Sequence, residues 1–152
     1  MPNWAESEMS VVLPSKNADK FENLFLEENS ELNKGKERYF ARCFKNYSER
    51  ESNDKGLTRL FIDFDAAWSL NSCMIDGYPQ ESEGHCPTLE EVCKELKVHR
   101  LAAYSKEPGI GFEEEIQYDR ESGLSYDCRD LFREPRADYL DDEETLEEGA
   151  EM

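Results

Sequence analysis

The chain has 152 residues, of which 38% are hydrophobic and 36% are charged. This length suits one domain of ordinary size. The formal net charge is −18, from 36 acidic and 18 basic residues. Direct binding to nucleic acid or to an anionic membrane is disfavoured, because both normally require clustered Lys and Arg. Cations and basic proteins are the favoured partners.

Five cysteines are present without a C-x-x-C pair. The opening residues 1–10 have neither the basic nor the apolar segment of a secretory signal, and no apolar run reaches the length of a membrane span. These features predict a protein of a reducing cytoplasm with free thiols.

In the first half of the chain, apolar spacing predicts two strands and one helix. Phe21, Leu24 and Phe25 have helical spacing, whereas Leu60 and Ile62 lie on one side of an alternating segment. Two further segments carry weaker signals. The expected elements are a strand over 7–13, a helix over 15–29, a segment at 38–47 that fits either helix or strand, a polar loop over 48–56 and a strand over 57–68.

In the second half, Thr88 and Glu91 form a T-x-x-E capping box, which predicts the start of a helix. Alternating apolar and acidic residues then predict a hairpin whose turn is the sequence Asp-Arg-Glu-Ser-Gly. The expected elements are a loop over 71–87, a helix over 88–98, a strand over 98–105 and a hairpin over 112–132.

This order of elements predicts an α+β fold, with two helices on one face of a mainly antiparallel sheet. The arrangement is that of a ferredoxin-like domain. Residues 1–132 are expected to form this single domain. Residues 133–152 show no apolar period and are expected to form an acidic, flexible tail.

Three short motifs lie in an order that resembles the YubB-like family. They are Met1-Pro2-Asn3-Trp4 at the start, Phe64-Asp65-Ala66-Ala67-Trp68-Ser69 at the end of a strand, and Tyr104, Glu107, Gly109 and Phe112 before a later strand. The resemblance covers roughly residues 1–126 and implies a ferredoxin-like domain encoded on plasmids, phages and bacterial genomes. It implies no catalytic residues.

Enzymatic, metal-binding and nucleic-acid-binding interpretations are each weaker. His85 and Cys86 are adjacent, with Cys93 nearby, but structural zinc sites use short ligand pairs that are absent here. A reactive cysteine needs an electropositive setting, which a chain at −18 does not favour. Aromatic residues on a sheet could stack on bases, yet the accompanying basic residues are lacking. We therefore expect no catalytic residue, no metal ion and no cofactor.

The distribution of acids gives the leading hypothesis. Glu113 and Glu115 should lie on one side of a strand, about 6.5–7 Å apart, close to the phosphate spacing of a nucleic-acid strand. The chain is therefore expected to be a mobile-element inhibitor that mimics nucleic acid or blocks the groove of a basic host defence protein, such as a CRISPR effector or a restriction nuclease. The expected contacts are Glu113, Glu114, Glu115, Asp119, Asp127 and Asp130, with Asp141, Asp142, Glu143 and Glu144 as a secondary set.

Two alternatives stay open at this point. The first is a protein–protein interaction module that uses no mimicry. The second is a small cytoplasmic enzyme with a reactive cysteine, for which Cys86 beside His85 or His99 is the candidate.

Overall fold

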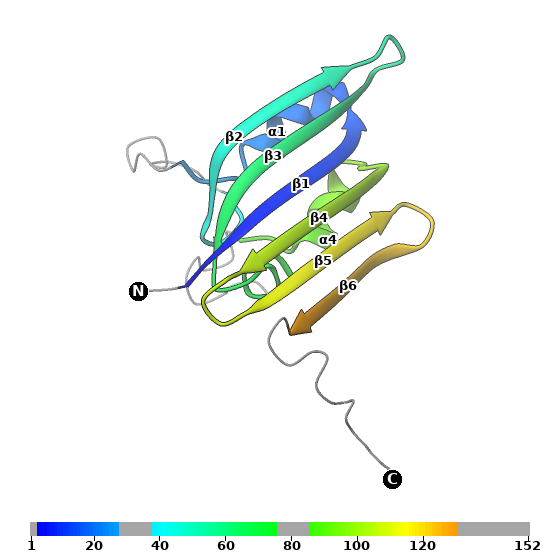
Figure 1. Ribbon diagram of the computed structural model, residues 1–152. Coiled ribbons are helices and arrows are strands. Elements are labelled where there is room, and N and C mark those ends of the chain that lie inside the picture. The colour runs from blue at the N-terminus through cyan, green and yellow to red at the C-terminus, as the bar shows by residue number, and fades with distance from the viewer. Residues whose placement is uncertain (1–2, 28–37, 76–85, 131–152) are drawn as a thin grey trace.

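The computed structural model describes residues 3–27, 38–75 and 86–130 and has one six-stranded sheet as its centre. Every neighbouring pair of strands is antiparallel, and the spatial order is β2-β3-β1-β4-β5-β6 (Figure 1). The strands are β1 (Trp4–Pro14), β2 (Cys43–Ser52), β3 (Leu57–Ala67), β4 (Arg100–Glu107), β5 (Phe112–Asp119) and β6 (Gly123–Asp130). The α+β class expected from the sequence is therefore confirmed.

The helical elements are short. They are η1 (Ser15–Asn17), α1 (Ala18–Glu22), a π-helical turn η2 (Asn71–Ile75) and α4 (Leu89–Glu95). Both α1 and α4 lie behind the sheet in Figure 1, on the same side. No helix of the described residues lies over the opposite side, which we call the open face.

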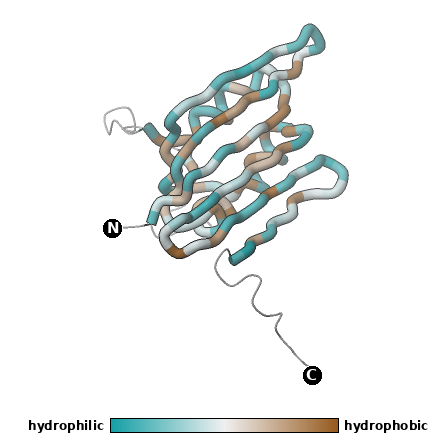
Figure 2. Tube along the Cα trace, viewed as in Figure 1, coloured by the Kyte–Doolittle hydropathy of each residue, from teal (hydrophilic) through white to brown (hydrophobic). Residues whose placement is uncertain are grey.

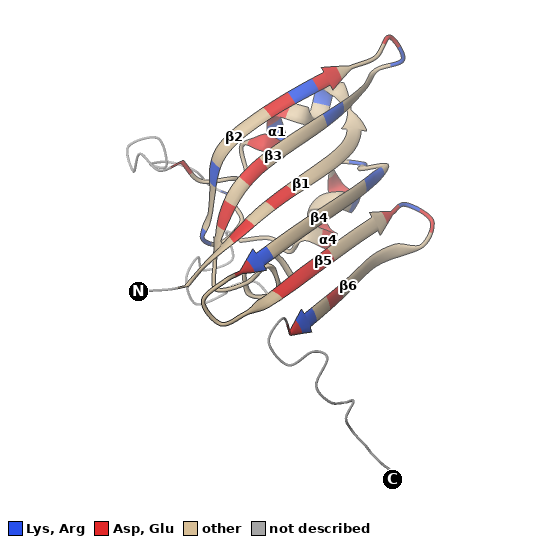
Figure 3. Cartoon of the chain, in the orientation of Figure 1, with Lys and Arg blue, Asp and Glu red and all other residues tan. Residues whose placement is uncertain are grey.

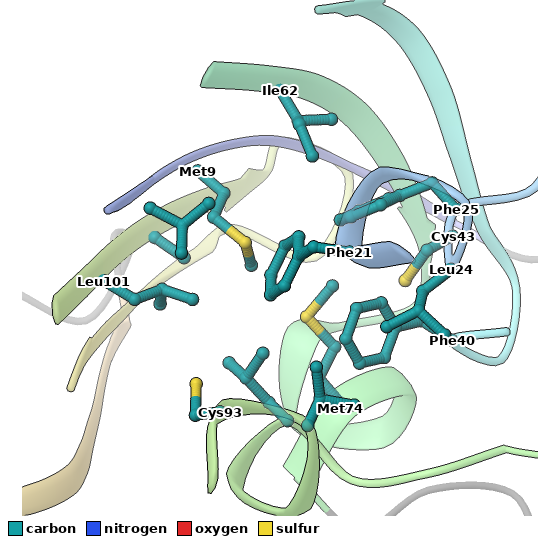
Figure 4. Packing of buried hydrophobic residues seen from close by; sticks show 14 of the residues in the cluster. Met9, Phe21, Leu24, Phe25, Phe40, Cys43, Ile62, Met74, Cys93 and Leu101 are labelled. Carbon is teal, nitrogen blue, oxygen red and sulfur yellow. The ribbon is translucent and has the colours of Figure 1, made fainter. Parts of the chain in front are cut away.

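The core lies between the sheet and the helices. Along β1 and β3 the buried and exposed residues alternate, as the hydropathy pattern in Figure 2 also shows. Met9 of β1 and Ile62 of β3 point toward Phe21 of α1, and Cys93 of α4 lies on the opposite side of the same hydrophobic cluster (Figure 4). All four side chains are buried. The open face carries the other residues of each strand, both charged ones such as Glu8 and apolar ones such as Phe61.

Several sequence-based expectations on element bounds were wrong. The helix expected over 15–29 ends at Glu22, and β1 begins at Trp4 rather than at Ser7. The polar loop expected over 48–56 is shorter, because β2 continues to Ser52. Pairing with β3 explains this result, since each residue from Ser48 to Ser52 has a partner in β3, such as Ile62 opposite Ser48. The segment 38–47 becomes strand from Cys43 onward.

Other expectations are confirmed. Thr88 caps α4, since its hydroxyl accepts from Glu91 N at 3.2 Å and the Glu91 carboxylate accepts from Thr88 N at 2.9 Å. The β5–β6 hairpin turns at Gly123, whose φ of +85° favours glycine. The expected tail at 133–152 lies outside the described residues.

Candidate functional site: the acidic rows of the open face

Strand register aligns the open-face side chains in rows that cross the sheet. Two neighbouring rows hold most of the acids, and we call them the acidic rows. The first contains Asp65, Glu6, Lys106, Glu113 and Arg129, and the second contains Asp63, Glu8, Tyr104, Glu115 and Asp127. Seven carboxylates face two cations, a net charge of −5. Figure 3 shows these acids gathered at the end of the sheet where β1 starts.

The most concentrated negative charge lies on β1 and β3. Glu6 is directly opposite Asp65, and Glu8 is directly opposite Asp63. Like charges placed opposite one another destabilise an antiparallel pair. Within the described residues none of these four carboxylates forms a salt bridge, and Asp65 accepts only a hydrogen bond from Asn46 Nδ2 at 3.1 Å. The sheet therefore carries two like-charge pairs side by side, and of these four carboxylates only Glu6 has a cation, Lys106, opposite it on its other side.

The acids on β5 and β6 are partly compensated. Glu113 accepts from Tyr104 Oη at 2.7 Å and from Arg129 Nε at 2.9 Å, and these two hydrogen bonds lower the pKa of Glu113. Arg129 also bridges to Asp127 at 3.1 Å. Glu113, Glu115 and Asp127 share the open face, as the sequence analysis expected for the first two, but they present less free charge than the acids of β1 and β3.

Glu114 was expected to be a partner contact, and this expectation is wrong. Its side chain lies on the helix-covered side of the sheet and is only 1% exposed. The carboxylate accepts hydrogen bonds from Leu70 N at 2.7 Å, Asn71 N at 3.0 Å and Tyr126 Oη at 2.6 Å. Glu114 therefore fixes the segment that enters η2 and cannot reach a partner.

The remaining expected contacts do not gather at the acidic rows. Asp119 lies at the far end of β5, where it accepts from Glu121 N at 2.8 Å in the hairpin turn. Asp130 ends β6 opposite Phe112, on the same side as Glu114. Asp141, Asp142, Glu143 and Glu144 lie outside the described residues.

Sequence reasoning missed the four acids of β1 and β3. Asp63 and Asp65 alternate with Ile62 and therefore belong to the other side of that strand, but the sequence does not show which strand lies next to them. Glu6 lay outside the strand predicted to begin at Ser7. The available signal was the alternation of Trp4, Glu6 and Glu8 with apolar or small residues, which extends the strand to its true start.

The opposite end of the open face carries different chemistry. Arg59 and Arg100 flank Val12 from β3 and β4, beside a shallow hollow of about 580 Å³. Each of these arginines also faces an acid: Glu51 Oε1 lies 3.7 Å from Arg59 Nη1, and Asp119 is opposite Arg100. This end of the open face is therefore mixed in charge.

Metal and thiol chemistry receive little structural support. In the described ranges, no group of three or more His, Cys, Asp and Glu is close enough to hold a metal ion. Burial raises the pKa of the Cys93 thiol to about 12 and also raises that of Cys43, which disfavours their thiolates. Cys86 is half-buried, and His85 lies outside the described residues.

Comparisons of the chain with protein-family models, curated proteins and solved structures found no match. Of the helices in the described residues, none has both the length and the apolar character needed to cross a membrane.

Proposed function

We propose that the acidic rows bind a basic surface of another protein. The observation that carries this proposal is the presence of two like-charge cross-strand pairs, Glu6 opposite Asp65 and Glu8 opposite Asp63. An arrangement that destabilises the free sheet becomes favourable once a cationic partner lies over it. Electrostatic attraction of this kind also accelerates association at low salt.

The geometry of the acidic rows suits mimicry of a nucleic-acid backbone. Successive carboxylates on one strand, such as Glu6 and Glu8, are about 6.5–7 Å apart, and neighbouring strands are about 4.8 Å apart. These spacings give a dense, regular array of negative charge. A groove lined with Lys and Arg that normally holds phosphates could accept such an array.

A ferredoxin-like unit is the architecture that we infer for the first four strands. These strands lie in the order β2-β3-β1-β4, with α1 and α4 on one side of the sheet. β5 and β6 extend the sheet beyond β4. With the resemblance to a family of mobile elements, this architecture supports an inhibitor of a host defence nuclease. The inhibitor would compete with nucleic acid for the groove of a CRISPR effector or a restriction enzyme.

Capture from a bacterial lysate tests the proposal. The double variant Glu8→Gln with Asp63→Asn removes one like-charge pair, and Glu49→Gln with Glu51→Gln, on the same face of β2, is the control that removes the same number of charges. We expect the wild type and the control to retain basic proteins, identified by mass spectrometry, and to release them as NaCl rises from about 50 to about 200 mM. The double variant should retain at least about fivefold less of these basic proteins than the wild type does.

The same variants separate function from mere folding. Removal of the like-charge pair should raise the midpoint of thermal unfolding by a few degrees, while capture falls. If the double variant captured the same proteins as the wild type, the acidic rows would not be the binding surface. The interpretation as a module without mimicry would then replace this proposal.

A further inference from the structure

A small hollow lies beside the acidic rows, between β1, β2 and β3. It has a volume of about 280 Å³ and is lined by Trp4, Phe44, Asn46 and Asp65. The rings of Trp4 and Phe44 meet edge to face, with their centroids 5.7 Å apart. Two aromatic side chains thus form one side of the hollow and a carboxylate forms the other.

Trp4 is left unusually open by the fold. Its side chain is 40% exposed although it belongs to a strand of the sheet. Tryptophan is enriched among the residues that dominate the binding energy of protein interfaces, because it brings a large apolar area that association removes from water. An exposed Trp next to Asp65, which forms no salt bridge among the described residues, therefore indicates a place where a partner side chain enters.

The polar side of the hollow offers acceptors. Asn46 Nδ2 donates to one carboxylate oxygen of Asp65 at 3.1 Å, which holds both side chains in place. Among the described residues Asp65 has no salt bridge, and Glu6 lies directly opposite it in β1. The second oxygen of Asp65 and the amide oxygen of Asn46 are both acceptors, so the hollow is suited to a cation with several donors.

We propose that this hollow binds the guanidinium group of an arginine side chain on the basic partner. The proposal rests on the function proposed above and specifies its anchor. Guanidinium is planar, stacks on aromatic rings and presents donors in a fork that matches a carboxylate, whereas the ammonium of lysine is a compact, strongly hydrated charge. A volume of about 280 Å³ equals roughly nine water molecules, which leaves room for the seven heavy atoms of an arginine side chain.

Titration with small probes tests the site. N-acetyl-arginine amide and N-acetyl-lysine amide are added at matched ionic strength to the ¹⁵N-labelled full-length chain, and the indole N–H resonance of Trp4 is followed. We expect a saturable shift with the arginine probe and a dissociation constant at least about threefold higher with the lysine probe. The resonance of Trp4 is assigned through its absence in Trp4→Phe.

Three variants locate the binding. Phe44→Leu removes an aromatic ring but keeps an apolar side chain, and Asp65→Asn removes the charge while keeping an acceptor for Asn46. Each substitution should raise the dissociation constant of the arginine probe about fivefold. Ile110→Ala is the control, because Ile110 is apolar and 56% exposed but does not line the hollow.

The outcomes also distinguish this inference from the proposed function. Equal binding of both probes, or unchanged binding in Phe44→Leu, would overturn the guanidinium site. If Phe44→Leu still captured basic proteins while Glu8→Gln with Asp63→Asn did not, the acidic rows would bind without this anchor. If arginine bound the hollow but the lysate yielded no salt-sensitive partner, the proposed function alone would fail.

Discussion

Three consecutive glutamates on β5 differ in where their carboxylates lie. Glu113 and Glu115 share the open face, whereas Glu114 is buried beneath the sheet. The pKa of the Tyr126 hydroxyl is raised by burial and by its hydrogen bond to Glu114. Strand residues alternate between the two sides of a sheet. The carboxylates of Glu113 and Glu115 are therefore available for binding, whereas that of Glu114 stabilises the fold.

We expect Glu114→Ala to lower the free energy of unfolding by about 2–4 kcal/mol, because it leaves the N–H groups of Leu70 and Asn71 without their acceptor. Glu115→Ala, one position along the same strand, should change it by no more than about 0.5 kcal/mol. Urea unfolding followed by circular dichroism measures both variants. Equal losses in the two would contradict the structural role of Glu114.

At the scale of elements, a charged network joins α1 to β2. Glu22 of α1 accepts hydrogen bonds from Lys45 Nζ at 2.9 Å and from Ser48 and Arg50, all on the helix-facing side of β2. Burial alone would raise the pKa of Glu22, but these three donors outweigh burial and lower it to about 2. The network therefore holds a short helix of five residues on the sheet.

Acid should weaken this attachment. Because the folded pKa of Glu22 lies below its ordinary value of 4.5, its stabilisation is complete above pH 4.5 and is lost as the pH falls toward about 2. We expect a loss on the order of 2 kcal/mol, allowing for the partial exposure of Arg50. Glu22→Gln should show a flatter dependence of unfolding free energy on pH. Parallel curves for both proteins would exclude this role.

Local signals predicted the elements better than the site. The capping box at Thr88 and the alternation around Ile62 each depend on neighbours in the chain, and both were confirmed. The polar β2 gave no such signal, because its burial is set by pairing with β3. The acidic rows depend on which strands are neighbours, so Glu6 and Asp65 could not be brought together from the sequence alone.

For the molecule as a whole, most of the net charge of −18 comes from two parts of the chain. Residues 137–152 contribute −8, and the acidic rows contribute −5 from the described sheet. Charge far from zero favours solubility and fast encounter with cations. Charge held on the sheet has in addition a fixed pattern, which a specific partner needs.

Truncation after Arg136 separates these sources. We expect the shortened chain to keep its fold and to capture the same basic proteins from lysate, because the acidic rows remain. The association rate at low salt should fall, since long-range attraction decreases with net charge. Biosensor traces at two salt concentrations measure this rate. Complete loss of capture would instead make the terminal segment the ligand.

The central position of β1 also affects how the chain is made. Its partners lie far along the chain, with Trp4 opposite Ala67 and Glu6 opposite Lys106. At a synthesis rate of about 5–20 residues per second, the first strand waits roughly 5–20 s before β4 emerges from the ribosome. During that interval β1 can pair with β3 along one edge, while its other edge has no partner strand. Glu6 and Glu8 alternate with the apolar residues of β1, and these charges then oppose the association of nascent chains through the free edge.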